Sequence, residues 1–290
     1  MSSDSGLWLA ERKAEQFVAE RPQLILPIDP FQIAATLEVE VKAKPETAQG
    51  VSGMLLRSGD SFGILYATHV PSEGFRRFSI GHELGHFLLD GHIDHVLPRG
   101  TGVHQSHAGF VSGDKFELEA DHFAAGLLMP DTLFKKALSR ASEGLAGITE
   151  LAETCKTSLT ATAIRYAQKT STCVAVVVST GVTVDYCFMS ASLKEFEDLE
   201  WLGKGESLPV GVETLAFNRD PENIRQARRS AVEADLKDWF GGRRSLAGTE
   251  EIVGLGAYGK TITILTTSTL PDDEHEEEDL EERWAVRFHR

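Results

Sequence analysis

The feature that constrains this chain most is the segment His82-Glu-Leu-Gly-His86, which has the pattern HExxH. The segment lies within residues 74–89 (GFRRFSIGHELGHFLL), whose apolar spacing predicts a helix buried beneath a reactive site. Positions i and i+4 lie about 40° apart around a helix, so both imidazoles face one point. Two histidines held in this way predict a zinc site, and Glu83 is placed to take a proton from the water that the metal activates.

A catalytic zinc ion takes three protein ligands and keeps one position open, so a third ligand is expected beyond His82 and His86. One candidate is His92, which follows His86 by six residues, as in the pattern HExxHxxGxxH. That pattern needs a glycine where this chain has Leu89, because the helix must break sharply there. The sequence therefore disfavours His92 as the ligand.

The favoured third ligand is Glu117, in the segment Glu117-Leu-Glu-Ala-Asp121 of a helix predicted over 115–128. Asp121 lies one turn later on the same face, where its carboxylate would hydrogen-bond a ligand histidine and fix its tautomer. Glu119, about 200° from Glu117 around the helix, is the competing choice of ligand. The structural alternative is an acidic helix start that complements the helix dipole.

The two segments FSIGHELGHFLL and FELEADHFAAGLLMP together resemble the ImmA/IrrE metallopeptidases, and the resemblance covers residues 25–170. It implies an α+β fold, with a minimal zincin-like peptidase domain and a helix-turn-helix-like bundle. In IrrE-like and CapP-like members a GAF-like sensor domain follows. The resemblance implies an endopeptidase dependent on Zn2+, with Mn2+ as a substitute in activity assays. Its implied substrate is a helix-turn-helix (XRE-type) repressor, cleaved after a stress signal such as DNA damage or phage infection.

The apolar spacing changes from helical to alternating at residue 172, which predicts a domain boundary near 171. Residues 1–171 form the expected peptidase domain, which includes helices over 148–155 and 158–169 in a bundle over about 130–171. Residues 172–290 suit the GAF-like α+β sensor domain. Its expected elements are a hairpin around Thr180-Gly181, helices over 192–202 and from Pro221 to Gly241, and strands within 251–268 and 284–289.

The net charge of −15 argues against a protein that coats nucleic acids. Residues 272–282 hold nine acidic residues and no Lys or Arg, and without them the balance is −6. The three cysteines form no CxxC pair, and the N-terminus lacks an apolar core. These features predict a cytoplasmic protein with no membrane partner.

Further residues have roles that the sequence leaves open. Residues 90–114 predict a loop rich in Gly and His, and a strand near 62–68 could hold an extended substrate by β-augmentation. Three arginines at helical spacing either face solvent or bind an anionic signal such as single-stranded DNA: Arg225, Arg228 and Arg229. Four side chains are candidates to stabilise the oxyanion: His104, His107, His122 and Tyr66.

Two motifs have competing interpretations. Residues 254–261 (GLGAYGKT) match a P-loop, but β-branched residues follow them instead of a helix, which predicts a glycine-rich hairpin. The helix-turn-helix resemblance over 148–169 suggests, as the alternative function, a DNA-binding transcriptional regulator with a structural metal site. The second helix offers only Arg165 and Lys169 as bases, which favours the peptidase interpretation.

Overall fold

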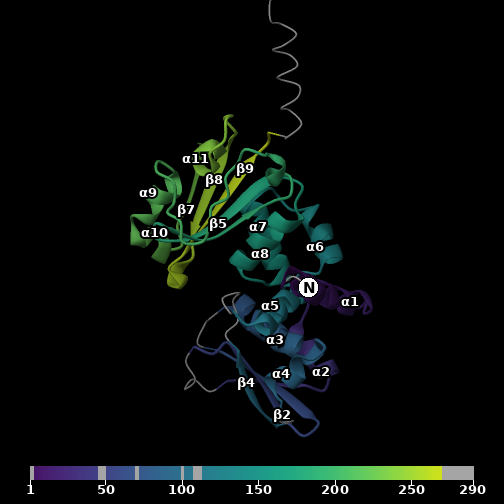
Figure 1. Ribbon diagram of the computed structural model, residues 1–290. Helices are drawn as coiled ribbons and strands as arrows, with labels where there is room; N and C mark the ends of the chain where they lie inside the picture. Colours follow the sequence, from purple (N-terminus) through teal and green to yellow (C-terminus); the bar gives the residue numbers. More distant parts are fainter. Residues whose placement is uncertain (1–2, 45–49, 69–71, 99–100, 107–112, 270–290) are drawn as a thin grey trace, which may run out of the picture. The chain divides into compact units, whose positions relative to one another are not determined.

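The computed structural model describes residues 3–44, 50–68, 72–98, 101–106 and 113–269 (Figure 1). Contacts divide the chain into two compact units. The N-terminal unit comprises residues up to Ala141 together with Thr149–Thr162, and the C-terminal unit comprises Ser142–Ile148 and the chain from Ala163 onward. Both units combine helices with a sheet, which confirms the α+β class. The predictions on His107, on residues 272–282 and on a strand over 284–289 lie outside the described residues.

The N-terminal unit contains a four-stranded sheet of order β1-β3-β2-β4. β2 (Gly53–Ser58) and β3 (Ser61–Tyr66) form a hairpin, with Gly59 at φ +62° in its turn. β1 (Glu40–Ala43) runs parallel to β3, and β4 (Thr101–Ser106) runs antiparallel to β2. Because β3 is paired on both sides, the prediction that the strand near 62–68 accepts a substrate strand is wrong. The edges of this sheet are β1 and β4.

The helices of this unit pack on the sheet and on one another, and the helices in contact lie far apart in the sequence. α3 (Glu73–Leu88) contacts β2 and β3 on one side and α5 (Lys115–Leu128) on the other, so it lies between α5 and the sheet (Figure 1). α1 (Ser3–Ala19) packs on α5, and α2 (Pro30–Thr36) packs on α3. Ile80 and Leu84 of α3 join the core of this unit and are fully buried. The helix that carries HExxH is therefore internal, as the apolar residues around the motif predict.

The segment 90–114, predicted as a loop, contains two regular elements among its described residues. α4 (His92–Val96) forms because Ile93 and Val96 pack on the apolar core, and β4 forms because it pairs with β2. Three helices follow α5: α6 (Asp131–Leu138), α7 (Gly144–Cys155) and α8 (Leu159–Lys169). α7 and α8 include the two predicted helices of the helix-turn-helix-like bundle.

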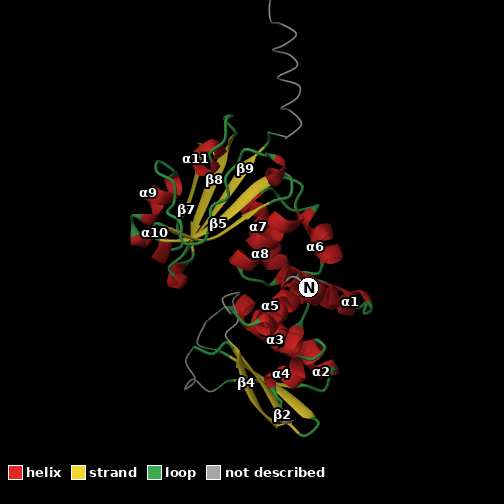
Figure 2. Cartoon of the chain, viewed as in Figure 1, coloured by secondary structure: helices red, strands yellow, loops and turns green. Residues whose placement is uncertain are grey.

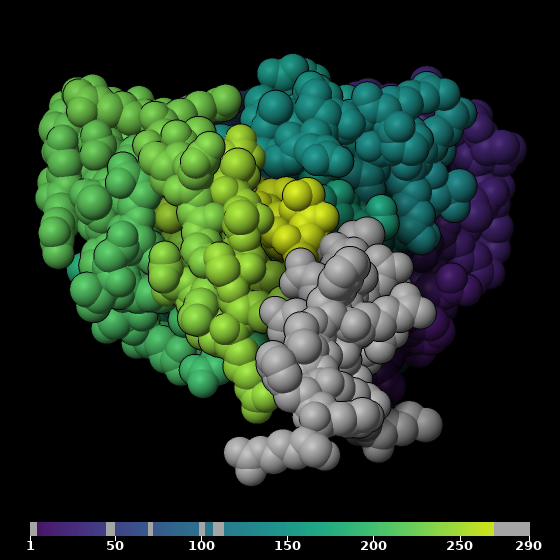
Figure 3. All heavy atoms as spheres, turned by 90° about the horizontal axis from the view of Figure 1, so that it is seen from above, coloured from purple at the N-terminus to yellow at the C-terminus, as the bar shows by residue number. Residues whose placement is uncertain are grey.

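The C-terminal unit contains an antiparallel sheet of order β6-β5-β9-β8-β7 (Figure 2). Its strands are β5 (Cys173–Thr180), β6 (Thr183–Met189), β7 (Arg229–Asp235), β8 (Ala247–Gly254) and β9 (Thr261–Thr267). Short helices accompany them: η1 (Leu193–Glu195), α9 (Glu213–Asn218), α10 (Pro221–Arg225), α11 (Leu236–Phe240) and η2 (Gly256–Tyr258). In the space-filling view, green to yellow atoms of this unit form a broad exposed face (Figure 3).

Two helices predicted for the C-terminal unit are wrong in their extent. Over 192–202 only η1 is helical, and the backbone N–H of Glu200 donates to the distant backbone oxygen of Phe240 at 2.7 Å instead of to a carbonyl within a helix. From Pro221 to Gly241 the chain forms α10, β7 and α11 instead of one helix. Here pairing of β7 with β8 outweighs the helical preference of its alanines.

The P-loop-like segment is a hairpin connection, as predicted. β9 follows it directly, and Lys260 forms an ion pair with Asp185 of β6 at 2.6 Å. Within the described part of the chain, no helix has the length and apolar character needed to cross a membrane.

Candidate metal centre

α3 presents the HExxH residues to the interior of the N-terminal unit. The helix begins where the Ser72 hydroxyl accepts a hydrogen bond from the backbone N–H of Phe75, and it ends at Leu89, whose backbone is extended. His82, Glu83 and His86 are all fully buried. Their burial in a helix that contacts both the sheet and α5 leaves little freedom for their side chains.

α5 approaches α3 closely because small residues face each other between the two helices. A Cβ atom at Gly85 would lie 3.1 Å from the Cα atom of Ala120, and one at Gly81 would lie 3.3 Å from the Cβ atom of Ala124. Asp114 begins α5 by accepting a hydrogen bond from the backbone N–H of Phe116. This start sets the position of Glu117 in the first turn of the helix.

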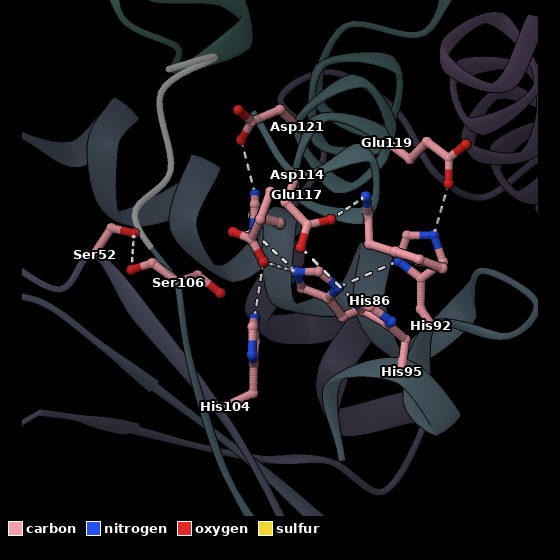
Figure 4. A network of polar contacts seen from close by, with 12 residues as sticks. Ser52, His86, His92, His95, His104, Ser106, Asp114, Glu117, Glu119 and Asp121 are labelled. Atoms are coloured by element: carbon pink, nitrogen blue, oxygen red, sulfur yellow. Dashed lines mark hydrogen bonds and ion pairs between the residues drawn. The ribbon is translucent and has the colours of Figure 1, made fainter. Parts of the chain in front are cut away.

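The contact between the helices brings Glu117 to the two histidines of the motif (Figure 4). Glu117 Oε2 lies 3.4 Å from His82 Nε2, and Glu117 Oε1 lies 3.2 Å from His86 Nε2. The two Nε2 atoms are 3.1 Å apart. These three residues form a group whose ligand atoms all lie within 4.8 Å of one another. Two imidazoles and one carboxylate match the ligand set of catalytic zinc sites, so the residues fit such an ion.

Neighbouring charges set the protonation of this group. Burial lowers the pKa of His82, but the Asp121 and Glu117 carboxylates outweigh burial and raise that pKa to about 10. Burial dominates at His86 and lowers its pKa to about 4. Burial alone would raise the pKa of Glu117, but hydrogen bonds from three histidines hold it well below its usual range. The Glu117 carboxyl group is therefore ionised at neutral pH.

Glu83 points from α3 toward β2. Its two carboxylate oxygens are buried and make no close hydrogen bond with the described residues, although the Ser106 side chain lies near enough to lower the pKa of Glu83. A Cβ atom at Gly53 would lie only 2.4 Å from Glu83 Oε1, so the glycine in β2 leaves the space that this carboxylate fills. Burial raises the pKa of Glu83 to about 7, against the attraction of His82. A carboxyl group with this pKa can accept and release a proton near neutral pH.

Three further predicted residues lie behind the ligand histidines. Asp121 Oδ1 lies 2.7 Å from His82 Nδ1, where the sequence places a carboxylate that orients a ligand. His92 and Glu119, the competing ligand candidates, are not in the group of ligand atoms. His92 Nδ1 lies 3.2 Å from His86 Nδ1, and His92 Nε2 lies 3.2 Å from Glu119 Oε2.

The candidates for the oxyanion donor occupy different places. His104 extends from β4, and its Nε2 atom lies 2.9 Å from Glu117 Oε1, at the edge of the centre. Tyr66, at the end of β3, packs edge-on against Phe31 with the ring centroids 5.4 Å apart. His122 faces Glu11 of α1 at 4.0 Å. Among these three, His104 is the one seen in contact with a residue of the ligand group.

Sequence reasoning did not single out Gly53, although it limits the position of Glu83. The available signal was a glycine at the start of a strand otherwise rich in apolar residues, which marks close approach of another group. The prediction that Arg225, Arg228 and Arg229 share a helix is wrong, because α10 ends at Arg225 and Arg229 begins β7. Arg225 forms an ion pair with Glu222 at 2.5 Å, and Arg228 forms one with Asp220 at 3.8 Å.

The fold and the site define a class. A helix with HExxH, packed between a sheet and a second helix that supplies a carboxylate, is an arrangement of the metallopeptidase type. Residues 34–166 match the model of a peptidase family described as the IrrE N-terminal-like domain. This match spans less than half of the chain and supports the resemblance to the ImmA/IrrE family.

One solved structure similar to this chain is a Mycobacterium tuberculosis transcriptional regulator. The two are 15% identical, the similarity covers 96% of this chain and 80% of the other, and the TM-score is 0.56. At this identity the likeness concerns the fold alone. No curated protein matches the chain.

Proposed function

We propose that this chain is a zinc-dependent endopeptidase that regulates transcription by cleaving a helix-turn-helix (XRE-type) repressor in the cytoplasm. The observation that carries the proposal is the group formed by the buried His82 and His86 with the partly exposed Glu117, and the buried Glu83 carboxylate on the same helix as the histidines. The match to the IrrE N-terminal-like peptidase domain supports the reaction class, and the similar structure, a transcriptional regulator by name, is consistent with a role in gene regulation.

His82, His86 and Glu117 would hold the zinc ion, or Mn2+ in assays, and Asp121 would orient His82. A zinc ion bound there would lower the pKa of a coordinated water toward about 7 and polarise the carbonyl of the peptide bond. Glu83 then accepts the proton of the attacking water and passes it to the leaving amine.

His104 is the residue we propose as donor to the oxyanion. It projects from the edge strand β4, and its side chain is partly exposed, so a substrate could reach it while its Nε2 atom stays near Glu117. β4 also offers its free edge, and we propose that the substrate pairs there as an additional strand. A peptide on β4 would have its backbone beside His104 and close to Glu117.

Residues 172–290 are proposed as the GAF-like sensor for the stress signal, DNA damage or phage infection. Arg225, Arg228 and Arg229 are the proposed contact for an anionic signal such as single-stranded DNA. Since Arg225 and Arg228 are already paired with Glu222 and Asp220, the ligand would have to displace these carboxylates. Replacing Arg225, Arg228 and Arg229 by Gln should uncouple the signal from cleavage, and an unchanged response would reject this site.

The alternative function, DNA-binding regulation with a structural metal site, draws on the name of the similar structure and on helices α7 and α8. It requires bases on α8 that reach phosphates. Arg165 is only 2% exposed, so it cannot serve in this way without rearrangement. Specific DNA binding by the full chain, unaffected by Glu83→Gln and without cleavage of a repressor, would favour this alternative.

The proposal is tested with the purified full chain, Zn2+ or Mn2+, and the helix-turn-helix repressor encoded by an adjacent gene. We expect one cut in the repressor. Glu83→Gln should keep zinc binding and lower the cleavage rate about 10²–10⁴-fold, because the proton acceptor is lost and the three ligands remain. Glu73→Gln, at an exposed position of the same helix, is the matched control. Cleavage at the wild-type rate by Glu83→Gln would contradict the mechanism.

A further inference from the structure

The imidazole of His86 has two neighbours of different kinds. Its Nε2 atom faces the ligand group, 3.2 Å from Glu117 Oε1. Its Nδ1 atom faces away from that group and meets the Nδ1 atom of His92 at 3.2 Å. His92 comes from α4, and its other ring nitrogen, Nε2, lies 3.2 Å from Glu119 Oε2 on α5 (Figure 4). Three residues from three helices thus form one continuous chain of contacts.

When His86 binds a metal through Nε2, the hydrogen bonds that link His86, His92 and Glu119 can be donated in one direction only. A ligating Nε2 atom carries no proton, so the neutral ring carries its proton on Nδ1 and must donate from there. His92 Nδ1 then has to accept, which leaves the proton of the neutral His92 ring on Nε2. That N–H donates to the Glu119 carboxylate, which can only accept when ionised.

Neighbouring residues hold His92 and Glu119 in place. His92 is 1% exposed, and the edge of its ring packs against Phe116 with the centroids 5.0 Å apart. Glu119 Oε1 lies 3.3 Å from Lys115 Nζ. On the other side, Gly6 of α1 leaves room for Glu119, since a Cβ atom at Gly6 would come within 2.3 Å of Glu119 Oε1. The carboxylate is therefore confined by two helices, and its remaining oxygen is directed to His92.

The two ligand histidines are supported differently. His82 donates directly to the Asp121 carboxylate at 2.7 Å, whereas an imidazole stands between His86 and its carboxylate. Groups of this kind fix the tautomer and orientation of a ligand histidine and raise its basicity. A neutral imidazole is a weaker acceptor than a carboxylate, so Glu119 is needed at the far end to polarise it.

We propose that His92 and Glu119 are a positioning pair for His86: they set its tautomer and ring orientation and so tune the metal affinity of the centre. This inference rests on the proposed metal site. It assigns His92 and Glu119, the two competing choices of ligand in the sequence, to a supporting role behind the ligands.

Zinc affinity of the metal-free full chain, measured by competition with a chromophoric chelator, tests the pair. His92→Phe removes both ring nitrogens and should weaken zinc binding about 10–100-fold. His92→Asn keeps an acceptor near the position of Nδ1 and should recover part of that loss. His95→Phe is the matched control: it alters the same short helix at a residue that stacks on Phe116, and affinity should stay within about 2-fold, since no bond to His86 is lost.

The outcomes separate this inference from the proposed function. If the wild-type chain binds no zinc, the metal site itself fails, and the positioning role fails with it. If the wild type binds zinc and folded His92→Phe binds it equally well, the metal site stands and the positioning pair is refuted.

A second measurement reads the protonation of His92 in the wild type itself. Nitrogen NMR of the zinc-loaded, histidine-labelled wild type reports which ring nitrogen carries the proton, and the His92 signals are assigned by their loss in His92→Asn. We expect a proton on His92 Nε2 and none on Nδ1. A proton on His92 Nδ1 would overturn the proposal, because His86 could then not donate to it.

Discussion

Gly53→Ala is the substitution that tests the placement of Glu83 most directly. The added methyl group would lie 2.4 Å from Glu83 Oε1, and ordinary contact begins at 3.4 Å, so the carboxylate must retreat by about 1 Å. A displacement of this size at a reacting group can cost about 100-fold in rate, equivalent to about 2.7 kcal/mol in the activation free energy. The three atoms nearest to this methyl group all belong to Glu83 and none to a proposed ligand, so zinc affinity should stay within about 2-fold.

The assay compares single-turnover cleavage of the repressor by wild type, Gly53→Ala and Gly63→Ala. Gly63, in the paired strand β3, is the matched control because a methyl group there would meet only the backbone oxygen of Glu40, at 3.4 Å. Gly63→Ala should therefore cleave at nearly the wild-type rate. A folded Gly53→Ala protein that also cleaves at the wild-type rate would refute the reasoning, since Glu83 would then not act from the position it occupies against β2.

Three further predictions concern stability and metal binding. Gly85→Leu should force α3 away from α5 and lower the free energy of unfolding, measured in urea, by about 1–3 kcal/mol. It should also abolish zinc binding in a titration, and unchanged zinc affinity would contradict the role of this contact. Zinc at 100 times its dissociation constant should raise the free energy of unfolding by about 2.7 kcal/mol, seen as a higher melting temperature that His86→Ala loses. Burial raises the pKa of Asp235, but the Ser245 hydroxyl and two backbone N–H groups outweigh it and lower that pKa overall. Its contribution to stability is therefore present above the usual carboxyl pKa of about 4 and lost as the pH falls through the lowered pKa, so Asp235→Asn should flatten this acid dependence in urea unfolding.

The sequence predicts the candidate site well where one helix determines the geometry. The i, i+4 spacing alone places His82 and His86 toward one point, and the structure has them so. The choice between Glu117 and Glu119 depends on which face of α5 packs on α3. The helical spacing within α5 does not determine that face. The glycines and alanines between the two helices decide it, because they set how closely and in which rotation the helices meet.

Sequence-based prediction is less accurate where contacts with residues distant in the sequence decide the local structure. The segment Ala231–Asp235 has helix-forming residues, and only its pairing with β8 makes it a strand. Likewise, the sequence around His92 and His104 predicts a loop, because α4 and β4 are short and owe their form to the core and to β2. The hairpins of both units were predictable, since a glycine turn between alternating runs is a local signal.

The three carboxylates of α5 are spread over little more than one helical turn, yet each makes its own contacts: Glu117 with His82 and His86, Glu119 with His92, and Asp121 with the far side of His82. Inserting or deleting one residue within this turn would rotate every later side chain by about 100° and disconnect several of these contacts at once. Related chains that keep this chemistry should accordingly vary in length before Asp114 or after the helix, and never between Glu117 and Asp121. An alignment of such chains with a gap inside that turn would mark either a misalignment or a protein that has lost the site.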